Sequence, residues 1–322
     1  MEGPWRHGRA WPRSTHSASA GSMPWRSWRP AMPSNNQWPA VDGWAVHVPG
    51  HTEERLPGSP AEPACGPEDA RRVLGRKGLL GKEPATRLAL CAVHRALGLP
   101  PARPSEPLPG AVGTAVVVAS NLGNVETVCA IQTEMRAGGS RVVSPLDAPN
   151  ASSNVIASTI ALWYGFTGPN LMVCSGATAG LDAVRLARLV IAAGRARRAV
   201  VVGVEPADPV ARRLAALRPG TPGALTAAAG CVLLGEPGAW GGTTGVCVGP
   251  VTRHRDPLPT EATPDPGLGD LYGAEGVIRL AVAAAGLAAG RLTGPVTVGC
   301  GDREDGWARL EVSRASAHGA AS

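Results

Sequence analysis

Aromatic residues other than tryptophan are scarce in this chain, because its 322 residues include only one Phe and two Tyr. With a hydrophobic content of 44%, a core must therefore be built mainly from Ala, Val, Leu and Ile. No stretch of 18 uncharged, predominantly apolar residues is present, so we predict no membrane-spanning helix and no membrane partner. A chain of this length can bury a full core as one large or two tightly joined α/β domains.

Motifs for metals and phosphates are also lacking. The seven cysteines lack CxxC spacing and mostly lie in apolar runs, which favours buried reduced thiols in a cytoplasmic protein over metal ligands or disulfides. Residues 75–82 do not form a phosphate-binding loop, because position 76 is Arg and position 83 is Glu. We therefore predict no metal, no cofactor and a cytoplasmic location.

Most of the positive charge lies at the N-terminus. Residues 1–38 hold five Arg, one Glu and five of the nine Trp, so they contribute +4 of the net +6 and leave +2 for the rest. Such an arm can bind nucleic acid or an acidic membrane surface. It has no helical period, however, and we predict a disordered extension over 1–39, with Met23 or Met32 as an alternative translation start. Nucleic acid is accordingly not an expected partner.

Apolar runs alternate with helical patterns from residue 41 onward. Strands are predicted at 41–49, 111–120, 171–173, 199–204, 228–234, 244–251, 296–298 and 308–312, and helices within 77–98 and at 124–137, 152–164, 178–193 and 270–290. This alternation predicts an α/β protein with a mostly parallel sheet that is covered on both faces. Residues 252–268 are rich in proline and are predicted to be a linker.

The most informative segment runs from residue 168 to residue 206. A short apolar strand is followed by a tight turn of small residues and by a helix rich in Ala, Leu and Val that ends at Gly194. This segment resembles the elbow that presents the catalytic cysteine in beta-ketoacyl synthases (ketosynthases) of fatty-acid and polyketide assembly. A helix start of this kind makes a thiol reactive. The position that should carry the thiol is Ala177.

The resemblance extends over roughly residues 40–312. Residues 144–153 are similar to the family's approach to the active site, and residues 165–169 to the run before the elbow strand. The resemblance implies a thiolase-like layered αβαβα fold of two similar halves, usually dimeric. For this chain it implies a complete first half at 40–251, a shortened second half at 269–314 and a tail at 315–322.

The second half lacks the family's two catalytic histidines. By resemblance, Asp270 stands at the second histidine position and Asp265 at the preceding lysine position, while residues 299–302 resemble the late Gly-Phe-Gly-Gly turn. Only His254 and His318 follow His94 in the chain, and we interpret both as exposed bystanders. Because condensation needs a thiolate and donors that stabilise an enolate, no recognisable condensing machinery is left.

The first functional hypothesis is an accessory subunit similar to the chain length factors of polyketide synthesis. It would pair with a catalytic ketosynthase, or with itself as a dimer, and would be served by an acyl-carrier protein. The chain departs from those factors in having Ala where glutamine is often found. A shortened second half is expected to leave sheet edges and apolar helices uncovered, which favours burial against a partner.

Two other hypotheses stay open. One is an acyltransferase or a cyclase/dehydratase-type enzyme that acts on carrier-bound acyl chains through a relocated residue, either Cys174, Ser175 or Asp270. The other is a relic or a module that binds the acidic carrier protein through a basic cluster. The cluster comprises Arg195, Arg197, Arg198, Arg212, Arg213 and Arg218.

Overall fold

The computed structural model of the protein describes residues 38–220, 223–256 and 266–314. The predictions on the N-terminal extension with Met23 and Met32, on Asp265 at the lysine position, and on the tail with His318 lie outside these residues. Among the described helices, none combines the length and the apolar character that crossing a membrane requires.

The elements follow the predicted order closely. The helices are α1 (Arg71–Leu74), α2 (Pro84–Ala96), α3 (Val125–Gly138), α4 (Val155–Tyr164), α5 (Ala179–Ala192), α6 (Pro209–Ala215) and α7 (Glu275–Ala288). The strands are β1 (Ala40–His47), β2 (Ala115–Ala119), β3 (Asn170–Val173), β4 (Arg198–Glu205), β5 (Ala228–Gly235), β6 (Val246–Val248), β7 (Thr252–His254), β8 (Val296–Asp302) and β9 (Gly306–Arg314). Helices α1 and α6 were not predicted, and several boundaries differ from the predictions. The strand expected at 244–251 is shorter, and β7 occupies the start of the predicted linker.

All nine strands belong to one sheet of order β3-β2-β4-β5-β1-β6-β9-β7, with β8 paired to β9. The prediction of a mostly parallel sheet is wrong. Only β2 pairs in parallel, with β3 and β4, and every other described pair is antiparallel. Long crossovers through helices bring β2, β3 and β4 side by side in one direction, whereas β5 and all later strands join antiparallel neighbours. The α/β class itself is confirmed.

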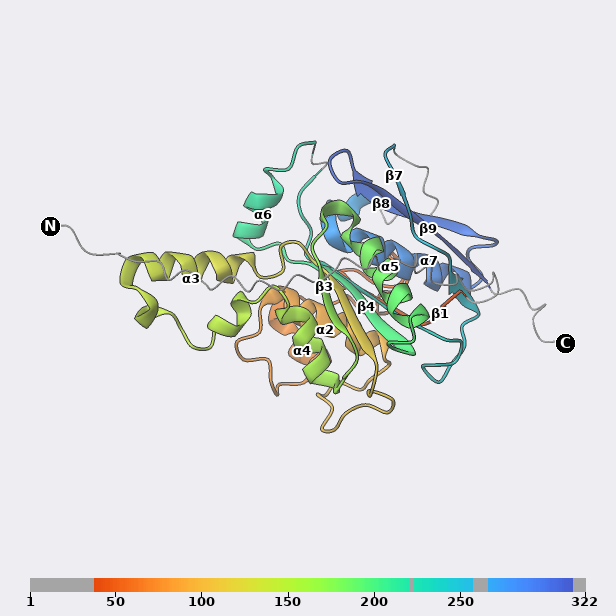
Figure 1. The fold of residues 1–322 in the computed structure, drawn as a ribbon, viewed down its shortest axis with the longest axis horizontal. Helices are drawn as coiled ribbons and strands as arrows, with labels where there is room; N and C mark the ends of the chain where they lie inside the picture. Colours follow the sequence, from red (N-terminus) through yellow and green to blue (C-terminus); the bar gives the residue numbers. More distant parts are fainter. Residues whose placement is uncertain (1–37, 221–222, 257–265, 315–322) are drawn as a thin grey trace, which may run out of the picture. The chain divides into compact units, whose positions relative to one another are not determined.

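The sheet divides the interior into two cores. In β2, Val116 and Val118 face a core shared with α2 and α4, while Val117 faces a second core shared with α5 and α7. Helices α5 and α7 also pack against β8 and β9. The sheet therefore curls around these two helices, giving successive layers of helices, strands, helices and strands (Figure 1).

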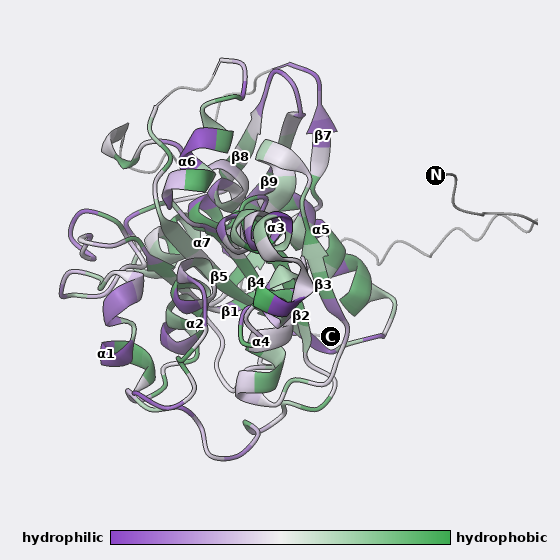
Figure 2. Ribbon diagram, turned by 90° about the vertical axis from the view of Figure 1, so that its left-hand side faces the viewer, coloured by the Kyte–Doolittle hydropathy of each residue, from purple (hydrophilic) through white to green (hydrophobic). Residues whose placement is uncertain are grey.

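The outer side of β9 is polar. Ala308, Leu310 and Val312 are buried against α5 and α7, whereas Arg309 and Glu311 between them are exposed. The neighbouring β7 carries the hydrophilic colour in Figure 2. On this face, a period-two alternation of apolar and polar residues supplies a solvated surface.

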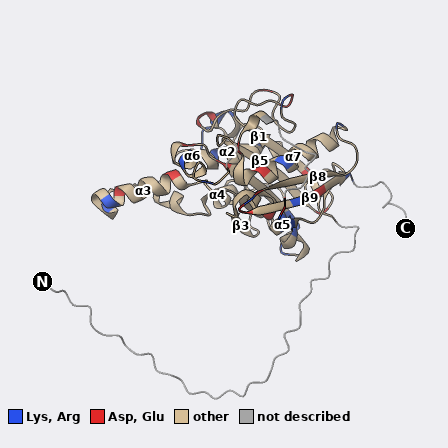
Figure 3. Cartoon of the chain, turned by 90° about the horizontal axis from the view of Figure 1, so that it is seen from above, with Lys and Arg blue, Asp and Glu red and all other residues tan. Residues whose placement is uncertain are grey.

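Helix α3 has no buried residue and extends away from the layers in both Figure 1 and Figure 3. It contacts α6 and the 3-10 turns that follow it, and it contacts no strand extensively. Val128 is 42% exposed and Met135 is 48% exposed. Exposed apolar side chains on a helix that packs on so little of the chain indicate a surface for contact with another molecule.

Candidate functional site

The site begins where β3 ends and α5 starts. Gly176 has φ +68, a conformation that residues with a Cβ rarely adopt. A Cβ at this position would also lie 1.9 Å from the Asp305 carboxylate. Both the backbone conformation and the lack of space therefore favour glycine here. The turn leads through Ala177, which is 4% exposed, into α5. The predicted elbow of strand, tight turn and helix is present.

A buried carboxylate fixes the elbow from below. Glu205, the last residue of β4, accepts hydrogen bonds from the backbone N–H groups of Asn121 at 2.8 Å and Leu122 at 3.0 Å. Asn121 in turn accepts from the Gly176 N–H and donates to the Gly176 carbonyl, both at 3.0 Å. Burial raises the pKa of Glu205 to about 7, although these donors oppose the shift. The loop after β2 is thus tied to both β4 and the elbow.

The backbone N–H of Ala177 is already paired. It donates at 2.8 Å to Oδ2 of Asp305, which lies in the hairpin between β8 and β9. Amide groups at a helix start favour negative charge, and here the chain supplies that charge itself. Asp302 shapes the hairpin by accepting from the N–H groups of Glu304 and Asp305. The amide at the start of this helix is therefore paired with a carboxylate of the same chain.

The hydroxyl of Ser175 donates at 2.6 Å to Asp182 in the first turn of α5. The same carboxylate oxygen accepts from the Thr178 hydroxyl at 3.0 Å and forms an ion pair with Arg253 of β7. Ser175 therefore faces a carboxylate already engaged by a cation and a second hydroxyl.

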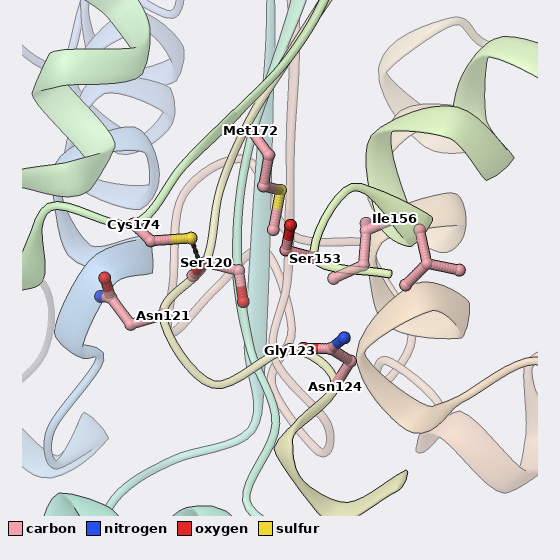
Figure 4. Close-up of a pocket in the computed structure, with 9 residues that line it drawn as sticks. Ser120, Asn121, Gly123, Asn124, Ser153, Ile156, Met172 and Cys174 are labelled. Atoms are coloured by element: carbon pink, nitrogen blue, oxygen red, sulfur yellow. Dashed lines mark hydrogen bonds between the residues drawn. The ribbon is translucent and has the colours of Figure 1, made fainter. Parts of the chain in front are cut away.

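Cys174 lies beside a small cavity of about 110 Å³. Its sulfur points at Ser120 and donates to the Ser120 carbonyl at 3.1 Å, as Figure 4 shows. Burial, followed by the charge of Glu205, raises the pKa of the Cys174 thiol. The cavity is lined by Ser120, Asn121, Gly123, Asn124, Ser153, Val155, Ile156, Met172 and Cys174. No basic or cationic side chain belongs to this lining, so the cavity supplies no group that would activate the thiol.

Asp270 belongs to an ion-pair network before α7. Its Oδ2 accepts from Arg218 at 2.8 Å, and Arg218 also reaches Asp302 at 3.1 Å. The Arg218 guanidinium lies 3.5 Å from the ring centroid of Tyr272. The network links the end of α6 to the β8–β9 hairpin, and through that hairpin to the Ala177 amide. Asp270 is thus placed as a structural anion.

Comparison with known proteins places this geometry in context. Residues 77–218 match the model of the beta-ketoacyl synthase N-terminal domain. Over these residues the chain is similar to a ketosynthase. A segment of 93 residues is 30% identical to 3-oxoacyl-(acyl-carrier-protein) synthase 2 of Vibrio harveyi and 31% identical to that of Vibrio cholerae serotype O1. The segment makes up 29% of this chain and 22% of each relative, so the match spans about a fifth of the relatives' length.

Solved structures confirm the fold. The ishigamide ketosynthase/chain length factor superposes with a TM-score of 0.64 at 18% identity, covering 86% of this chain and 99% of that one. A type II polyketide synthase acyl-carrier protein in complex with its ketosynthase gives 0.64 at 14% identity, with coverages of 87% and 99%. A ketosynthase in complex with its chain length factor from Xenorhabdus doucetiae gives 0.53 at 18%, with coverages of 86% and 99%. The thiolase-like fold predicted from the elbow is therefore present.

The ketosynthase-like site unites only part of what the sequence suggested. Cys174, Ser175 and Ala177 share the elbow, and Asp270 joins it through the chain of contacts described above. Sequence reasoning missed Asp305, Asn121 and Glu205. Nothing in the residue pattern signals Asp305, because it lies in a hairpin 128 residues beyond Ala177. The run of Val residues that ends in Glu205 did offer a signal, since a carboxylate closing a buried strand needs partners.

The predicted basic cluster is not one surface. Arg198 begins β4, where its guanidinium donates to the Thr114 hydroxyl and to the Pro109 and Ala239 carbonyls. Arg218 follows the other end of β4 and is bound to Asp270 and Asp302. Strand β4 has eight residues and spans about 25 Å. The arginines at 195–198 therefore lie at the start of this strand, and those at 212–218 follow its other end. Basic and acidic positions are interspersed in Figure 3.

Proposed function

We propose that this protein is a non-catalytic, chain-length-factor-like partner of a catalytic ketosynthase in polyketide or fatty-acid-type biosynthesis. The observation that carries the proposal is the occupied elbow, where Ala177 replaces a nucleophile and Asp305 pairs with the amide that would stabilise an oxyanion. Covalent condensation needs both groups. An elbow kept in shape without them fits a subunit that supplies structure and not chemistry.

Contacts at the other candidate residues support the same proposal over the enzymatic alternative. The Cys174 thiol donates to a carbonyl and has a raised pKa, Ser175 donates to an already paired Asp182, and Asp270 is held by Arg218. A relocated nucleophile or base needs an activating neighbour. The acyltransferase and cyclase/dehydratase hypotheses lack such a neighbour among the described residues.

Two features of the first half suit contact with a partner. Strand β3 ends the sheet, so one side of its backbone has no strand beside it among the described residues. Helix α3, with its exposed Val128 and Met135, follows the strand adjacent to β3. An unpaired strand edge and a helix with exposed apolar side chains each suit burial in a dimer. We infer that a ketosynthase covers this surface and that an acyl-carrier protein serves the assembled pair.

The test is to co-express the chain with a ketosynthase of its own pathway and to assay condensation with malonyl-carrier protein. We expect the two proteins to co-purify and the pair to form product that neither protein forms alone. Variants Cys174→Ala and Ser175→Ala should leave the rate of the pair unchanged. Turnover by the lone chain that either substitution abolishes would instead establish the enzymatic alternative.

Acylation gives a second, independent readout. The chain and its ketosynthase partner would be incubated with an acyl-thioester and their peptides analysed by mass spectrometry. We expect the acyl group on the partner's active-site cysteine and on no residue of this chain. An acyl adduct on Cys174 or Ser175 would contradict the proposal.

A further inference from the structure

Three side chains with metal-binding atoms meet in the core, away from the elbow. His47 is the last residue of β1, Cys65 lies in the loop that follows it, and Cys91 lies on α2. Their exposed fractions are 0%, 7% and 1%. One imidazole nitrogen and two sulfurs, brought from three separate segments, thus share a space closed to solvent.

The spacing of these atoms suits a common ligand. The imidazole nitrogen and both sulfurs all lie within 4.8 Å of one another. The Cys65 sulfur is 3.9 Å from Nε2 of His47. With metal–sulfur bonds of about 2.3 Å and metal–nitrogen bonds of about 2.0 Å, a trigonal centre separates its ligand atoms by about 4 Å. The cluster needs only a small contraction to hold an ion.

The Arg95 cation lies within electrostatic range of both thiols. His47 retains one buried nitrogen, Nδ1, without a hydrogen-bond partner among the described residues, although Nε2 contacts the Cys65 carbonyl at 2.9 Å. Nε2 is therefore the nitrogen that faces the Cys65 sulfur, and an ion bound there would take the place of its contact with the carbonyl.

We propose that His47, Cys65 and Cys91 form a buried binding site for a soft monovalent cation of the Cu(I) type. Thiolate sulfur and imidazole nitrogen are the ligands that such an ion takes. Structural zinc takes four protein ligands, and the cluster offers three. Two thiolates and Cu(I) leave one negative charge, which the nearby Arg95 cation balances, whereas a divalent ion would leave an excess positive charge.

The site is independent of the proposed function, because it involves no residue of the elbow. The test uses the full chain, reduced and kept free of oxygen, with Cu(I) supplied as its coloured bicinchoninate complex. We expect one equivalent of copper to pass from the chelator to the protein, which bleaches the colour. X-ray absorption at the copper edge should then report two sulfur ligands and one nitrogen ligand.

Substitutions assign the site. Cys65→Ala and Cys91→Ala should each weaken copper binding on the order of 100-fold or more. Cys231→Ala is the matched control, since this thiol is also fully buried but lies outside the cluster, and its affinity should equal that of the wild type. Circular dichroism checks that each variant is folded, and Cys65→Ala, in a loop, remains informative if a helix variant unfolds.

Two results would overturn the proposal. One is a wild-type chain that leaves the copper with bicinchoninate. The other is copper binding that survives in both cluster variants and is lost in Cys129→Ser, which would assign it to the exposed thiol of α3.

Discussion

At the elbow, one carboxylate decides how a restored nucleophile would behave. Asp305 lies 2.8 Å from the Ala177 amide, so a thiol introduced by Ala177→Cys would ionise beside a negative charge. A neighbouring carboxylate raises the pKa of a thiol, and the amide that would otherwise stabilise the thiolate is already used. We expect Ala177→Cys alone to react slowly with iodoacetamide at pH 7. The double variant Ala177→Cys/Asp305→Asn should react at least about tenfold faster, since one pKa unit is a tenfold change in thiolate.

The measurement is the pH profile of alkylation at the peptide containing position 177, followed by mass spectrometry. Cys174 in the same peptide region serves as the internal reference, because its surroundings are the same in both variants. Equal pKa values for the introduced thiol in the single and double variants would show that Asp305 does not control the site.

Individual residues were predictable from the sequence only where the chain is locally regular. Ala177 could be placed because the strand, turn and helix that define its position are contiguous. Asp270 was placed in the right region but given a catalytic alternative, since its ion pair with Arg218 joins residues 52 apart. Asp305 could not be found, because a long-range contact leaves no mark in either local pattern.

Three helices converge on a buried carboxylate at the base of α3. Glu83 precedes α2, is 8% exposed, and has one carboxylate oxygen without a hydrogen-bond partner among the described residues. Burial raises its pKa to about 7, a hydrogen bond to Thr127 opposes the shift, and the charges of Asp208 and Glu126 add to it. The native state therefore binds this proton more tightly than the unfolded chain does. It follows that this group's contribution to the free energy of unfolding falls as the pH rises from about 4.5 to about 7.

Glu83→Gln tests this linkage, because the amide resembles the protonated acid. We expect the variant to exceed the wild type in free energy of unfolding by about 1–2 kcal/mol at pH 8, less than the whole pKa difference implies because nearby water screens the charge. At pH 4.5 the two should agree. Urea unfolding at both pH values is the measurement, with Glu54→Gln, an exposed carboxylate, as control. A pH-independent difference would contradict the assigned pKa shift.

The two central helices meet through glycine. A Cβ at Gly180 of α5 would lie 2.8 Å from the backbone nitrogen of Gly276 of α7, and one at Gly276 would lie 2.7 Å from the Leu181 nitrogen. Alanine normally stabilises a helix by about 1 kcal/mol relative to glycine. Here we expect Gly180→Ala to lower the free energy of unfolding by about 2–3 kcal/mol, because backbone atoms cannot move aside as side chains do.

Urea unfolding of Gly180→Ala beside Gly66→Ala measures this effect. Gly66 has φ −69 and no atom within 4 Å of an added Cβ, so alanine should be neutral there. If Gly180→Ala instead raises the free energy of unfolding, α5 and α7 can move apart without loss of stability.

The elements themselves were largely predictable, whereas strand direction was not. Runs such as Val200 to Val204 and the small-residue helices announce their type through period and composition. Direction depends on which strands become neighbours, and β5 pairs with both β4 and β1 in the antiparallel sense. The alternation of strands and helices along the chain therefore indicated the fold class correctly but gave the wrong direction for most strand pairs.

For the whole molecule, the layers leave one surface unexplained. The outer side of β9 is polar and needs no cover, while α3 carries apolar side chains and packs on little of its own chain. Exposed apolar area is unfavourable in water, and its burial against a partner lowers the free energy of the complex. The proposed pairing with a ketosynthase therefore predicts that affinity for the partner, and not the stability of the lone chain, depends on α3.

Val128→Asp tests this dependence against Val112→Asp. Val128 is 42% exposed on α3, and Val112 is 85% exposed before β2, at the opposite end of that strand from α3. We expect Val128→Asp to weaken binding to the co-purified ketosynthase at least about tenfold, because a charge would be buried at the interface. Val112→Asp should bind as the wild type does, and neither substitution should change the melting temperature of the lone chain. Equal affinities for the two variants would move the interface away from α3, while condensation that still requires both proteins would leave the accessory role standing.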